Sequence, residues 1–379
     1  MLIGVPKEIK NHEYRVGLTP AGVRELVAAG HEVLIENDAG RAIGLDNTQY
    51  LQAGANVAGS AHKVFKQAHM IIKVKEPQTS ECKMLSPGQI LFTYLHLAAD
   101  QTQTDLLLKS GASCIAYETV TDDHGGLPLL APMSEVAGRL APQEGAACLR
   151  KIQGGSGILM GGVPGVAAAH VTVIGGGVVG LNAARIALGM GANVTILDRS
   201  LARLKEINDL FGDRLNTLYS TQETLLSEIK VADMVIGAVL IPGAAAPKVI
   251  SREMLSHMKA GSVLVDVAID QGGCFATSKA TTHQHPTFVV DGVIHYCVAN
   301  MPGAVARTST FALTNATLPY ALQLANKGLN ALVSNEHLLN GLNVHNGKLT
   351  CKAVASAFDY GFVEKAEALG FLSNVKKIA

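Results

Sequence analysis

Aromatic residues are scarce in this sequence, and tryptophan is absent altogether. Phenylalanine, tyrosine and tryptophan together make up 4% of the 379 residues, whereas hydrophobic residues as a class make up 48%. The core must therefore be built mainly from Val, Ile, Leu and Ala, which suits buried parallel strands packed beneath helices. A chain of this length is expected to form two domains, or three.

The sequence also has no excess of charge of either sign. Lys and Arg together number 31, as do Asp and Glu, so the formal net charge is zero. A nucleic-acid partner is not expected, because binding to phosphates requires an excess of Lys and Arg. Disorder is not expected either, because it is typical of chains with a high net charge and few apolar residues.

Cysteine pairs, long apolar runs and a signal peptide are missing as well. The six cysteines are irregularly spaced and none forms a C-x-x-C pair, so neither a zinc site nor a disulfide framework is expected. No segment has about 18 or more consecutive apolar residues. Met1–Glu8 lacks the basic flank and apolar segment of a signal peptide. These absences predict a cytoplasmic protein with reduced thiols and no membrane partner.

Strand-like and helix-like segments alternate over the first third of the chain. Apolar runs predict strands at residues 2–5, 31–36, 70–74, 89–94 and 113–117. Helices are predicted at 21–29, where Thr19 is a plausible cap and Pro20 lies in the first turn, and at 102–109. Such alternation implies a parallel sheet covered by helices on both faces.

The rest of the chain repeats this pattern after an interruption. One long helix is predicted at 134–152, with Pro142 inside it, and a glycine-dense loop follows at 154–165. A second strand–helix series begins at His170 and continues to about Cys297. The last part of the chain is expected to be mostly helical, at 309–327 and 354–369.

A dinucleotide-binding motif is the strongest local signal. Gly175, Gly177 and Gly180 form G-x-G-x-x-G directly after a β-branched strand and at the start of a helix. Gly175 is expected to make the tight turn, Gly177 to let a pyrophosphate approach the backbone, and Gly180 to let the helix pack on the strand. The free N–H groups at the start of the helix then face the phosphates.

An acidic residue stands where the motif requires one. Asp198 ends the next strand, at 193–197, about 20 residues after the glycines, where a carboxylate accepts hydrogen bonds from the ribose. Because this carboxylate would repel a 2′-phosphate, NAD is favoured over NADP as the cofactor. Arg199 and Arg203 follow closely and weaken that preference; Arg203 either helps to hold the adenosine side or is a solvated helix charge.

Several strings along the chain resemble one enzyme family. Residues 4–20, which run from Gly4 through Arg15 to Pro20, resemble the amino-terminal signature shared by alanine dehydrogenases and the NAD-binding subunit of proton-pumping transhydrogenase. Residues 171–180 with Asp198 resemble the second signature of that family, and residues 73–77, 93–98 and 265–273 also look like it. The resemblance implies reversible oxidative deamination of L-alanine to pyruvate and ammonium, with NAD taking the hydride.

The resemblance, together with residue chemistry, indicates the substrate-binding groups. Arg15 precedes the first helix, and its planar fork matches a carboxylate, unless it is an ordinary surface arginine. Lys75 ends the strand at 70–74, and its ammonium suits a substrate carboxylate or carbonyl oxygen. Lys73, two residues earlier on the same face, is the natural control. Asn300, in a loop that resembles the one closing over nicotinamide, is expected near the substrate.

Two residues are expected to carry the proton chemistry. The resemblance assigns proton transfer to His96, one of thirteen histidines, which follows the strand at 89–94. It assigns a catalytic carboxylate to Asp270, after the strand at 262–267, whereas Asp266 on the same segment is the alternative. Asp270 could instead cap a turn beside Gly272.

The resemblance also implies a set of cofactor contacts, mostly through backbone and apolar groups. Ser134, at the start of the long helix, is one of them and is equally a candidate N-cap. The expected cofactor residues are Ser134, Gly175, Gly177, Val178, Val179, Gly180, Asp198, Arg203, Ser220, Val239, Leu240, Val267, Ala268, Ile269, Asp270, Lys279, Val298, Ala299, Asn300 and Met301.

At one point the sequence departs from the family pattern. Some members carry Glu and His on the helix after the cofactor domain, where a magnesium ion has been placed. The matching positions here are Gln323 and Lys327, which provide no carboxylate oxygens. No metal is therefore expected.

The implied architecture is α/β, with two doubly wound Rossmann-like domains and a cleft between them. The NAD-binding domain is expected at 130–306, and the substrate domain is expected to be discontinuous, with 1–129 joined by 307–379. The resemblance also implies a homohexamer. Two other functions remain open: an NAD(H)-binding subunit of the transhydrogenase type, and a sensor that binds NAD without catalysis.

Overall fold

Two α/β units make up the chain, and the computed structural model describes residues 1–239 and 246–370 of it. One unit consists of Met1–Pro132 together with Val305–Ala379, and the other of Met133–Ala304. The predicted cofactor residue Leu240 lies outside the described residues. Each sheet is mostly parallel with antiparallel strands at one edge, so the prediction of two Rossmann-like α/β units is confirmed apart from those edges.

The first unit contains an eight-stranded sheet in the order β15-β14-β6-β5-β4-β1-β2-β3. Strands β1 to β6 run parallel, whereas β14 pairs antiparallel with both β6 and β15. The strands are β1 (Leu2–Val5), β2 (Glu32–Glu36), β3 (Asn56–Ala58), β4 (Met70–Ile72), β5 (Ile90–Thr93), β6 (Ser113–Ala116), β14 (Leu342–His345) and β15 (Lys348–Leu349).

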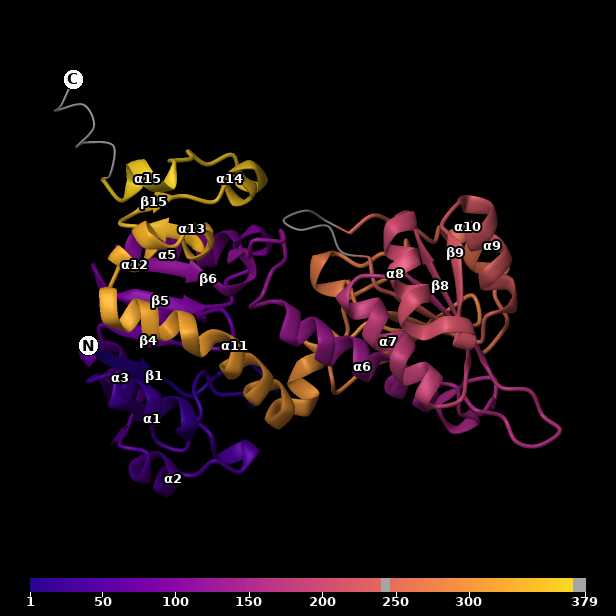
Figure 1. Ribbon diagram of the computed structural model, residues 1–379, viewed down its shortest axis with the longest axis horizontal. Helices are drawn as coiled ribbons and strands as arrows, with labels where there is room; N and C mark the ends of the chain where they lie inside the picture. The colour runs from indigo at the N-terminus through magenta and orange to yellow at the C-terminus, as the bar shows by residue number, and fades with distance from the viewer. Residues whose placement is uncertain (240–245, 371–379) are drawn as a thin grey trace. The chain divides into compact units, whose positions relative to one another are not determined.

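Helices from both ends of the chain surround this sheet. The early ones are α1 (Pro20–Ala28), α2 (Asn47–Gln52), α3 (Ala61–Gln67), α4 (Thr79–Cys82) and α5 (Gln101–Ser110). The late ones are α11 (Ala306–Lys327), α12 (Asn330–Ser334), α13 (Glu336–Asn340), α14 (Lys352–Phe358) and α15 (Lys365–Ala368). Thr19 caps α1 by accepting the Gly22 N–H, as predicted. Helix α11 packs against α1, and Figure 1 shows it passing in front of β4 and β5.

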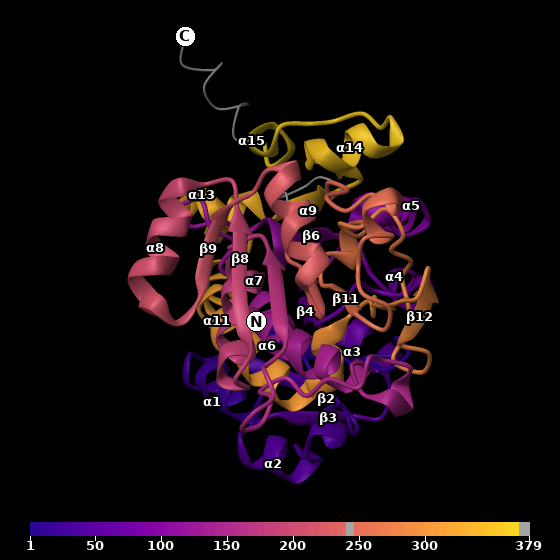
Figure 2. The ribbon, with the colours of Figure 1, turned by 90° about the vertical axis from the view of Figure 1, so that its right-hand side faces the viewer.

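The second unit contains a seven-stranded sheet in the order β12-β13-β11-β10-β7-β8-β9, in which only β12 is antiparallel to its neighbour. Its strands are β7 (His170–Ile174), β8 (Asn193–Asp198), β9 (Asn216–Tyr219), β10 (Met234–Gly237), β11 (Val263–Asp266), β12 (Thr287–Val290) and β13 (Val293–Tyr296). Its helices are α6 (Ala131–Cys148), α7 (Val178–Gly189), α8 (Leu201–Phe211), α9 (Gln222–Val231) and α10 (Arg252–Leu255). Figure 2 shows α7 and α8 beside β8 and β9.

The cores of both units are built from aliphatic side chains, as the composition predicts. Every residue of the central strands β10 and β11 is buried, which is typical of parallel strands covered on both faces. The six cysteines all lie in the described part of the chain and all are free thiols. Among residues 1–239 and 246–370, no helix combines the length and the apolar character needed to cross a bilayer.

Some element boundaries differ from the predictions for identifiable reasons. The helix predicted at 134–152 begins at Ala131, because the turn before it already bonds the Ala131 N–H to the Leu127 carbonyl. Ser134 lies within this helix, so its predicted role as an N-cap is wrong. The helix predicted at 354–369 is two short helices, because Asp359 adopts a left-handed conformation with φ of 56° after α14.

His295 lies on β13 and is fully buried. Its Nε2 is 2.7 Å from Thr277 Oγ1, its Nδ1 is 3.0 Å from the Val293 carbonyl oxygen, and its ring stacks on Phe288. Burial lowers the pKa of His295 below 6.5, and the Val293 carbonyl and the carboxylates of Asp266 and Asp291 oppose that shift only in part. The folded protein therefore favours a neutral imidazole at this position.

We expect the free energy of unfolding to fall as the pH is lowered through and below about 6.5. Unfolded His295 binds a proton at its ordinary pKa of 6.5, whereas folded His295 resists it, so unfolding takes up a proton in that range. Thermal melts from neutral to acidic pH on the native protein and on His295→Gln would check this. The native protein should lose more stability than the variant below the ordinary histidine pKa; equal slopes would contradict the expectation.

Candidate active site

Parallel strands bring three predicted residues to one edge of the first unit's sheet. Arg15 lies in the loop after β1, Lys75 lies after β4, and His96 lies after β5. Strands β1, β4 and β5 are neighbours in the sheet and point the same way, so the segments that leave them share its carboxyl edge. Ligands bind at that edge in open α/β sheets.

Arg15 is buried and already holds a carboxylate of this chain. The side chain is 2% exposed, its Nε lies 2.7 Å from Glu13 Oε1, and its Nη2 lies 2.6 Å from Glu13 Oε2. Burial alone would lower the pKa of Arg15, but Glu13, together with Tyr94 and Glu8, outweighs burial and raises it, so the guanidinium stays charged. The alternative that Arg15 is an ordinary surface arginine is therefore wrong, and Glu13 sets the orientation of its planar fork.

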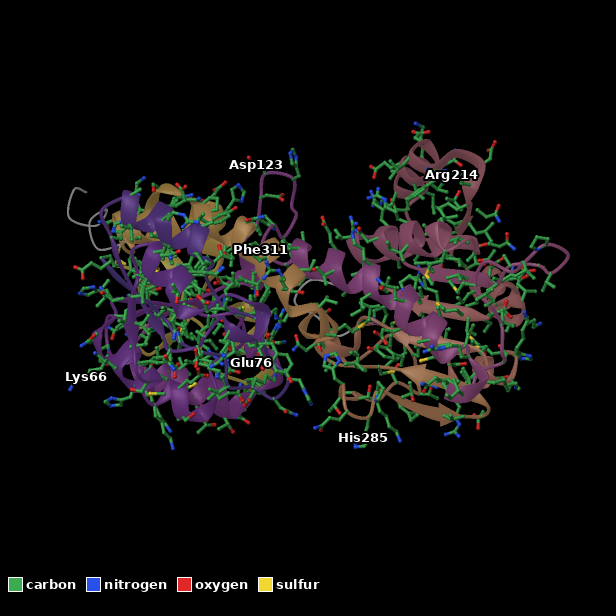
Figure 3. All side chains as sticks on the ribbon, turned by 90° about the horizontal axis from the view of Figure 1, so that it is seen from below. Lys66, Glu76, Asp123, Arg214, His285 and Phe311 are labelled. Atoms are coloured by element: carbon green, nitrogen blue, oxygen red, sulfur yellow. The ribbon has the colours of Figure 1, made fainter. Side chains whose placement is uncertain are left out.

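Lys73 and Lys75 have different environments, although the sequence places them on one face of a strand. Strand β4 ends at Ile72, so both lysines lie in the segment after it. The Lys73 ammonium is completely buried and donates to Glu8 at 2.9 Å and to Glu81 at 2.7 Å. The Lys75 ammonium lies 4.0 Å from a Glu76 oxygen, and its side chain is 9% exposed. The Lys73 ammonium is therefore bound in internal ion pairs. Glu76, the neighbour of Lys75, is labelled in Figure 3.

A carboxylate at the end of β6 fixes the backbone of His96. His96 adopts a left-handed conformation with φ of 50°, which is uncommon for a residue with a side chain. Its N–H donates to Glu118 Oε1 at 2.6 Å, and the Leu95 N–H donates to the same oxygen at 3.1 Å. His96 Nδ1 is 3.9 Å from that oxygen, and the imidazole stacks on the Tyr94 ring at an interplanar angle of 9°. His96 is therefore held by Tyr94, which follows β5, and by Glu118, which follows the neighbouring strand β6.

Glu13 and Glu118 were not predicted from the sequence, although both positions carried a signal. Glu13 lies two residues before Arg15, and Glu118 lies two residues after β6, which is the parallel neighbour of β5. A carboxylate that directly follows one strand is a candidate to bond to the residues that follow the neighbouring strand. Glu13 also lies within the signature at residues 4–20, whereas Glu118 belongs to no recognisable motif.

The three glycines of the dinucleotide motif have distinct surroundings in the second unit. Gly175 has φ of 98°, and a Cβ there would lie 2.7 Å from the Ala238 carbonyl oxygen. A Cβ on Gly180 would lie 1.8 Å from the Gly175 carbonyl oxygen, whereas a Cβ on Gly177 would meet nothing within 4 Å. Packing therefore requires glycine at 175 and 180 but not at 177. The space at Gly177, beside the start of α7, fits the close approach of a phosphate.

Asp198 and Arg203 hold the glycine turn from the neighbouring strand and helix. The Gly176 N–H donates to Asp198 Oδ2 at 2.7 Å, and Arg203 Nε donates to the Gly176 carbonyl at 2.6 Å. The other Asp198 oxygen accepts the Ser200 N–H at 2.8 Å. A carboxylate oxygen can accept two hydrogen bonds, and each Asp198 oxygen accepts one of those just described, so Asp198 retains acceptor capacity for a ribose. Arg203 is not merely a solvated charge.

The two candidate aspartates after β11 have different roles. Asp266 is fully buried, and its carboxylate accepts from the N–H groups of Ala268 and Cys274 and from the Ser278 hydroxyl. Burial raises the pKa of Asp266, although these donors oppose the shift. Asp270 is exposed and lies on the 3-10 turn Ile269–Gln271. Asp266 therefore stabilises the turn that carries Asp270. The turn-capping role that was the alternative for Asp270 is performed by Asp266.

Asn300 ends the segment that leaves β13. It has φ of 68°, and its carbonyl oxygen lies 3.1 Å from His283 Nε2. The neighbouring Ala299 N–H donates to the Thr281 carbonyl at 3.1 Å, and Met301 is buried at the start of a 3-10 turn. The loop that contains Thr281 and His283 therefore holds the Asn300 backbone in a conformation that few side-chain-bearing residues adopt.

The remaining predicted cofactor residues lie mostly after parallel strands of the second sheet. Ser220 follows β9, and its N–H donates to the Asp198 carbonyl at 2.9 Å. Val239 follows β10, and Val267, Ala268 and Ile269 follow β11. Residues 298–301 follow β13, and Val178 and Val179 begin α7. Lys279 is exposed in a loop, and Ser134 lies on α6, which packs against α7 near Val179.

The positions considered for a metal bind other parts of the protein. Gln323 Oε1 accepts from Asn335 at 3.0 Å, and the Lys327 ammonium is 3.4 Å from Ser334 Oγ.

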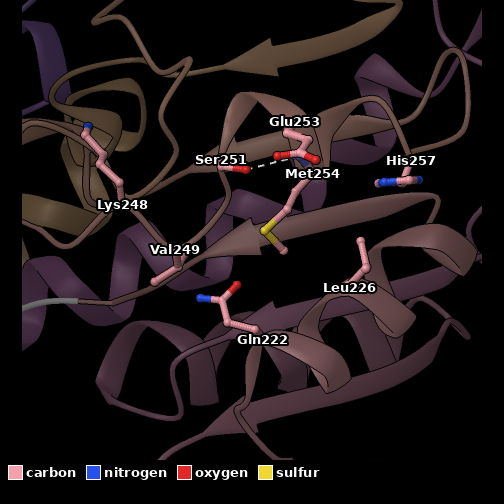
Figure 4. Close-up of a pocket in the computed structure, with 8 residues that line it drawn as sticks. All are labelled: Gln222, Leu226, Lys248, Val249, Ser251, Glu253, Met254 and His257. Atoms are coloured by element: carbon pink, nitrogen blue, oxygen red, sulfur yellow. Dashed lines mark hydrogen bonds between the residues drawn. The ribbon is translucent and has the colours of Figure 1, made fainter.

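A separate cavity of about 300 Å³ lies in the second unit (Figure 4). It is lined by Gln222, Leu226, Lys248, Val249, Ser251, Glu253, Met254 and His257, which include none of the predicted site residues.

Known protein families match almost the entire chain. The family model described as "Alanine dehydrogenase/PNT, N-terminal domain" matches residues 4–137, and the one described as "Alanine dehydrogenase/PNT, C-terminal domain" matches residues 141–352. An alanine dehydrogenase from Halomonas elongata is 62% identical over 371 residues, covering 98% of this chain and 100% of the relative. An alanine dehydrogenase from Mycolicibacterium smegmatis is 55% identical, covering 97% and 100%.

Solved structures agree with these relatives. A structure of L-alanine dehydrogenase matches with a TM-score of 0.91 and 50% identity, covering 95% of this chain and 99% of the other. A transhydrogenase structure from Sinorhizobium meliloti matches with a TM-score of 0.79 at 24% identity, covering 92% and 98%. The second likeness establishes the fold alone.

Proposed function

The chain belongs to the alanine dehydrogenase/PNT family, and we propose from this that it interconverts L-alanine with pyruvate and ammonium, using NAD. It is an oxidoreductase that acts on the CH–NH2 group of an amino acid. The observation that supports the substrate most strongly is the 62% identity to an alanine dehydrogenase over 98% of this chain. The overall reaction takes up one water and releases one proton for each L-alanine oxidised.

In this proposal Arg15 and Lys75 bind the substrate. Arg15 is charged and bonded to Glu13. The plane of its guanidinium is therefore oriented before a substrate carboxylate arrives. Lys75 provides a second positive charge, 4.0 Å from Glu76, for the carboxylate or the carbonyl oxygen. A group fixed in advance pays little ordering cost on binding, which is why buried, braced cations suit this role.

His96 transfers protons in this proposal, and Asp270 assists. The ammonium group of L-alanine first loses the proton that the overall reaction releases. Loss of hydride from the α-carbon of the resulting amine then leaves an iminium carbon that water attacks. His96 accepts a proton from that water and later returns one to the nitrogen as ammonia leaves. The exposed carboxylate of Asp270 stabilises the positive charge on the iminium nitrogen. Asn300 donates hydrogen bonds from its amide to orient the substrate.

The second unit is proposed as the NAD-binding domain, and the first as the substrate domain. NAD, when bound, accepts the hydride from the α-carbon. The open space at Gly177, the N-terminus of α7 and the partly exposed Asp198 carboxylate fit its pyrophosphate and ribose. The proposed cofactor contacts at Ser134, Ser220, Val239, Lys279 and the segments after β11 and β13 complete this site.

We expect Asp198→Ala to raise the KM for NAD by roughly tenfold and to reduce the preference over NADP. The substitution removes the ribose acceptor, the repulsion of a 2′-phosphate and the bond to the Gly176 N–H. Initial rates with NAD and NADP over a range of concentrations would measure this. A variant that keeps the native ratio of kcat/KM for the two cofactors would contradict the assignment.

The test of the function is NADH absorbance at alkaline pH, with purified protein, NAD and L-alanine. L-Valine, L-serine and D-alanine would be compared on the same plate. Rapid NADH formation with L-alanine is the expected result. A protein that binds NADH but oxidises none of these amino acids would refute the proposal and favour a transhydrogenase-type or sensor function.

We further propose that the protein is a cytoplasmic homohexamer. One segment of the second unit exposes four large apolar side chains, Ile152, Leu159, Val163 and Val166. Exposed apolar side chains that lie close together in a segment are typical of subunit contacts. Light scattering coupled to size-exclusion chromatography would report the number of subunits directly.

A further inference from the structure

Three charged side chains form a buried cluster beneath the segment that carries Lys75. Glu8 comes from the loop after β1, Lys73 from the segment after β4, and Glu81 from α4. Their side chains are 2%, 0% and 1% exposed, and the Lys73 ammonium bonds to both carboxylates. A buried ion cluster is costly unless every member is bonded, so its position calls for an explanation beyond stability.

The two carboxylates share Lys73 but hold different parts of the backbone. Glu8 Oε1 accepts the Val74 N–H at 2.7 Å and the Lys75 N–H at 3.4 Å. Glu81 uses its second oxygen to accept the Gln78 N–H at 2.8 Å, at the start of its own short helix. Glu8 therefore holds the backbone at Val74 and Lys75, whereas Glu81 holds the backbone at the start of the helix that follows.

The charges in the cluster do not cancel. Two carboxylates surround one ammonium, so the cluster carries one negative charge when all three groups are ionised. Burial raises the pKa of Glu8, Lys73 opposes this, and Glu81 and Glu13 add to it. Burial alone would lower the pKa of Lys73, but Glu8 and Glu81 outweigh it and raise that pKa. Lys73 therefore stays charged and fixes the Glu8 carboxylate in place.

The rest of the Lys75 segment is held on its other side. The Thr93 hydroxyl donates to the Lys75 carbonyl, and the Tyr117 hydroxyl donates to the Lys73 carbonyl, both at 3.0 Å. Lys10, from the same loop as Glu8, bonds to Glu76. The loop after β1 thus contacts the segment both at the Lys75 N–H and at the neighbouring side chain.

We propose that Glu8 is a positioning residue for substrate binding: held by Lys73, it fixes the backbone of Lys75 and so places the ammonium that contacts the substrate. This inference rests on the proposed role of Lys75. It assigns a function to a buried carboxylate that does not itself touch the substrate. It also predicts that Glu81, which is bonded to the same lysine, does not affect substrate affinity.

The test compares Glu8→Gln and Glu8→Ala with Glu81→Gln as a matched control. Each glutamine variant removes one buried charge from the same lysine and leaves a cluster of zero net charge, so both are expected to fold. For each variant, the KM for pyruvate and for NADH would be measured in reductive amination. Oxamate, a pyruvate-like monocarboxylate, would be titrated against the enzyme–NADH complex, and thermal melts would report stability.

The expected result is weaker binding of the substrate with unchanged binding of the cofactor. The KM for pyruvate and the Kd for oxamate should rise by about threefold in Glu8→Gln and by about tenfold or more in Glu8→Ala, whereas the KM for NADH stays unchanged. Glu81→Gln should change only the melting temperature. If Glu81→Gln raises the KM for pyruvate as much as Glu8→Gln does, or if neither Glu8 variant raises it, the inference is wrong.

Failure of the underlying function would look different. If the native enzyme does not reduce pyruvate with ammonium and NADH, or if Lys75→Ala keeps the native KM for pyruvate, then the proposed function or the role of Lys75 is wrong, and the inference falls with it. If the native enzyme and Lys75→Ala behave as proposed but the Glu8 variants match the native enzyme, only the positioning role is overturned.

Discussion

His96→Ala is expected to lower kcat for L-alanine oxidation by about a thousandfold, within the range lost when a general acid–base group is removed. An imidazole can both accept and donate a proton, and Glu118 and the Tyr94 ring hold His96 at the carboxyl edge of the first sheet. NADH binding, followed by fluorescence, should be unchanged, because the proposed cofactor contacts lie in the second unit.

The matched control for this variant is His62→Ala. His62 is an exposed histidine of the same unit, on α3, where alanine preserves the helix. It should keep native kcat. An active His96→Ala enzyme, with more than about a tenth of native kcat over the whole pH range, would be far above the residual rate expected without a general base, and it would move the proton-transfer role to another residue.

Gly180→Ala is expected to lower the stability of the fold, whereas Gly177→Ala is expected to weaken cofactor binding at unchanged stability. The added Cβ at position 180 would lie 1.8 Å from the Gly175 carbonyl oxygen, so the turn before α7 has to move. Overpacking of this kind costs about 1–3 kcal/mol or more, and we expect a clearly lower melting temperature together with loss of NADH binding. At position 177 the Cβ meets nothing within 4 Å, so stability should be native.

The effect of Gly177→Ala should appear only when the cofactor binds. If a pyrophosphate approaches the backbone there, the methyl group should weaken NADH binding by roughly tenfold or more at unchanged melting temperature. Fluorescence titration with NADH and a thermal melt of each variant are sufficient. Native NADH affinity in Gly177→Ala would place the phosphates elsewhere, whereas a native melting temperature in Gly180→Ala would contradict the packing argument.

The sequence was sufficient for the fold class because its strands are buried and its helices follow a clear alternation. It was not sufficient for the antiparallel edge of the first sheet, where β14 pairs with β6. The signal was present: Asn346 and Gly347, with φ of 46° and 76°, form the two-residue turn between β14 and β15. The surrounding helix-rich pattern obscured it, and two strands of two to four residues carry little periodicity.

The candidate site was predictable in its residue types but not in its supporting contacts. The sequence placed Arg15, Lys75 and His96 after parallel strands, and strand order alone brings those positions to one edge. Residue chemistry alone did not distinguish Lys73 from Lys75, and that choice rested on the family resemblance, because two lysines in the same segment after β4 differ only in what surrounds them. Glu8 and Glu81 make that difference, and they lie 65 and 8 residues away from Lys73 along the chain.

The first unit is assembled from the two ends of the chain, and this has a consequence for biosynthesis. Strand β6 receives its partner β14 only after more than two hundred further residues have been translated, and the separation between α1 and its partner α11 is longer still. The second unit is continuous and can complete its own sheet first, as domains commonly do during synthesis. Until the carboxyl-terminal segment emerges, the unpaired edge of β6 is open to other strands. We therefore expect nascent chains that stop before α11 to be the aggregation-prone species and the main clients of chaperones.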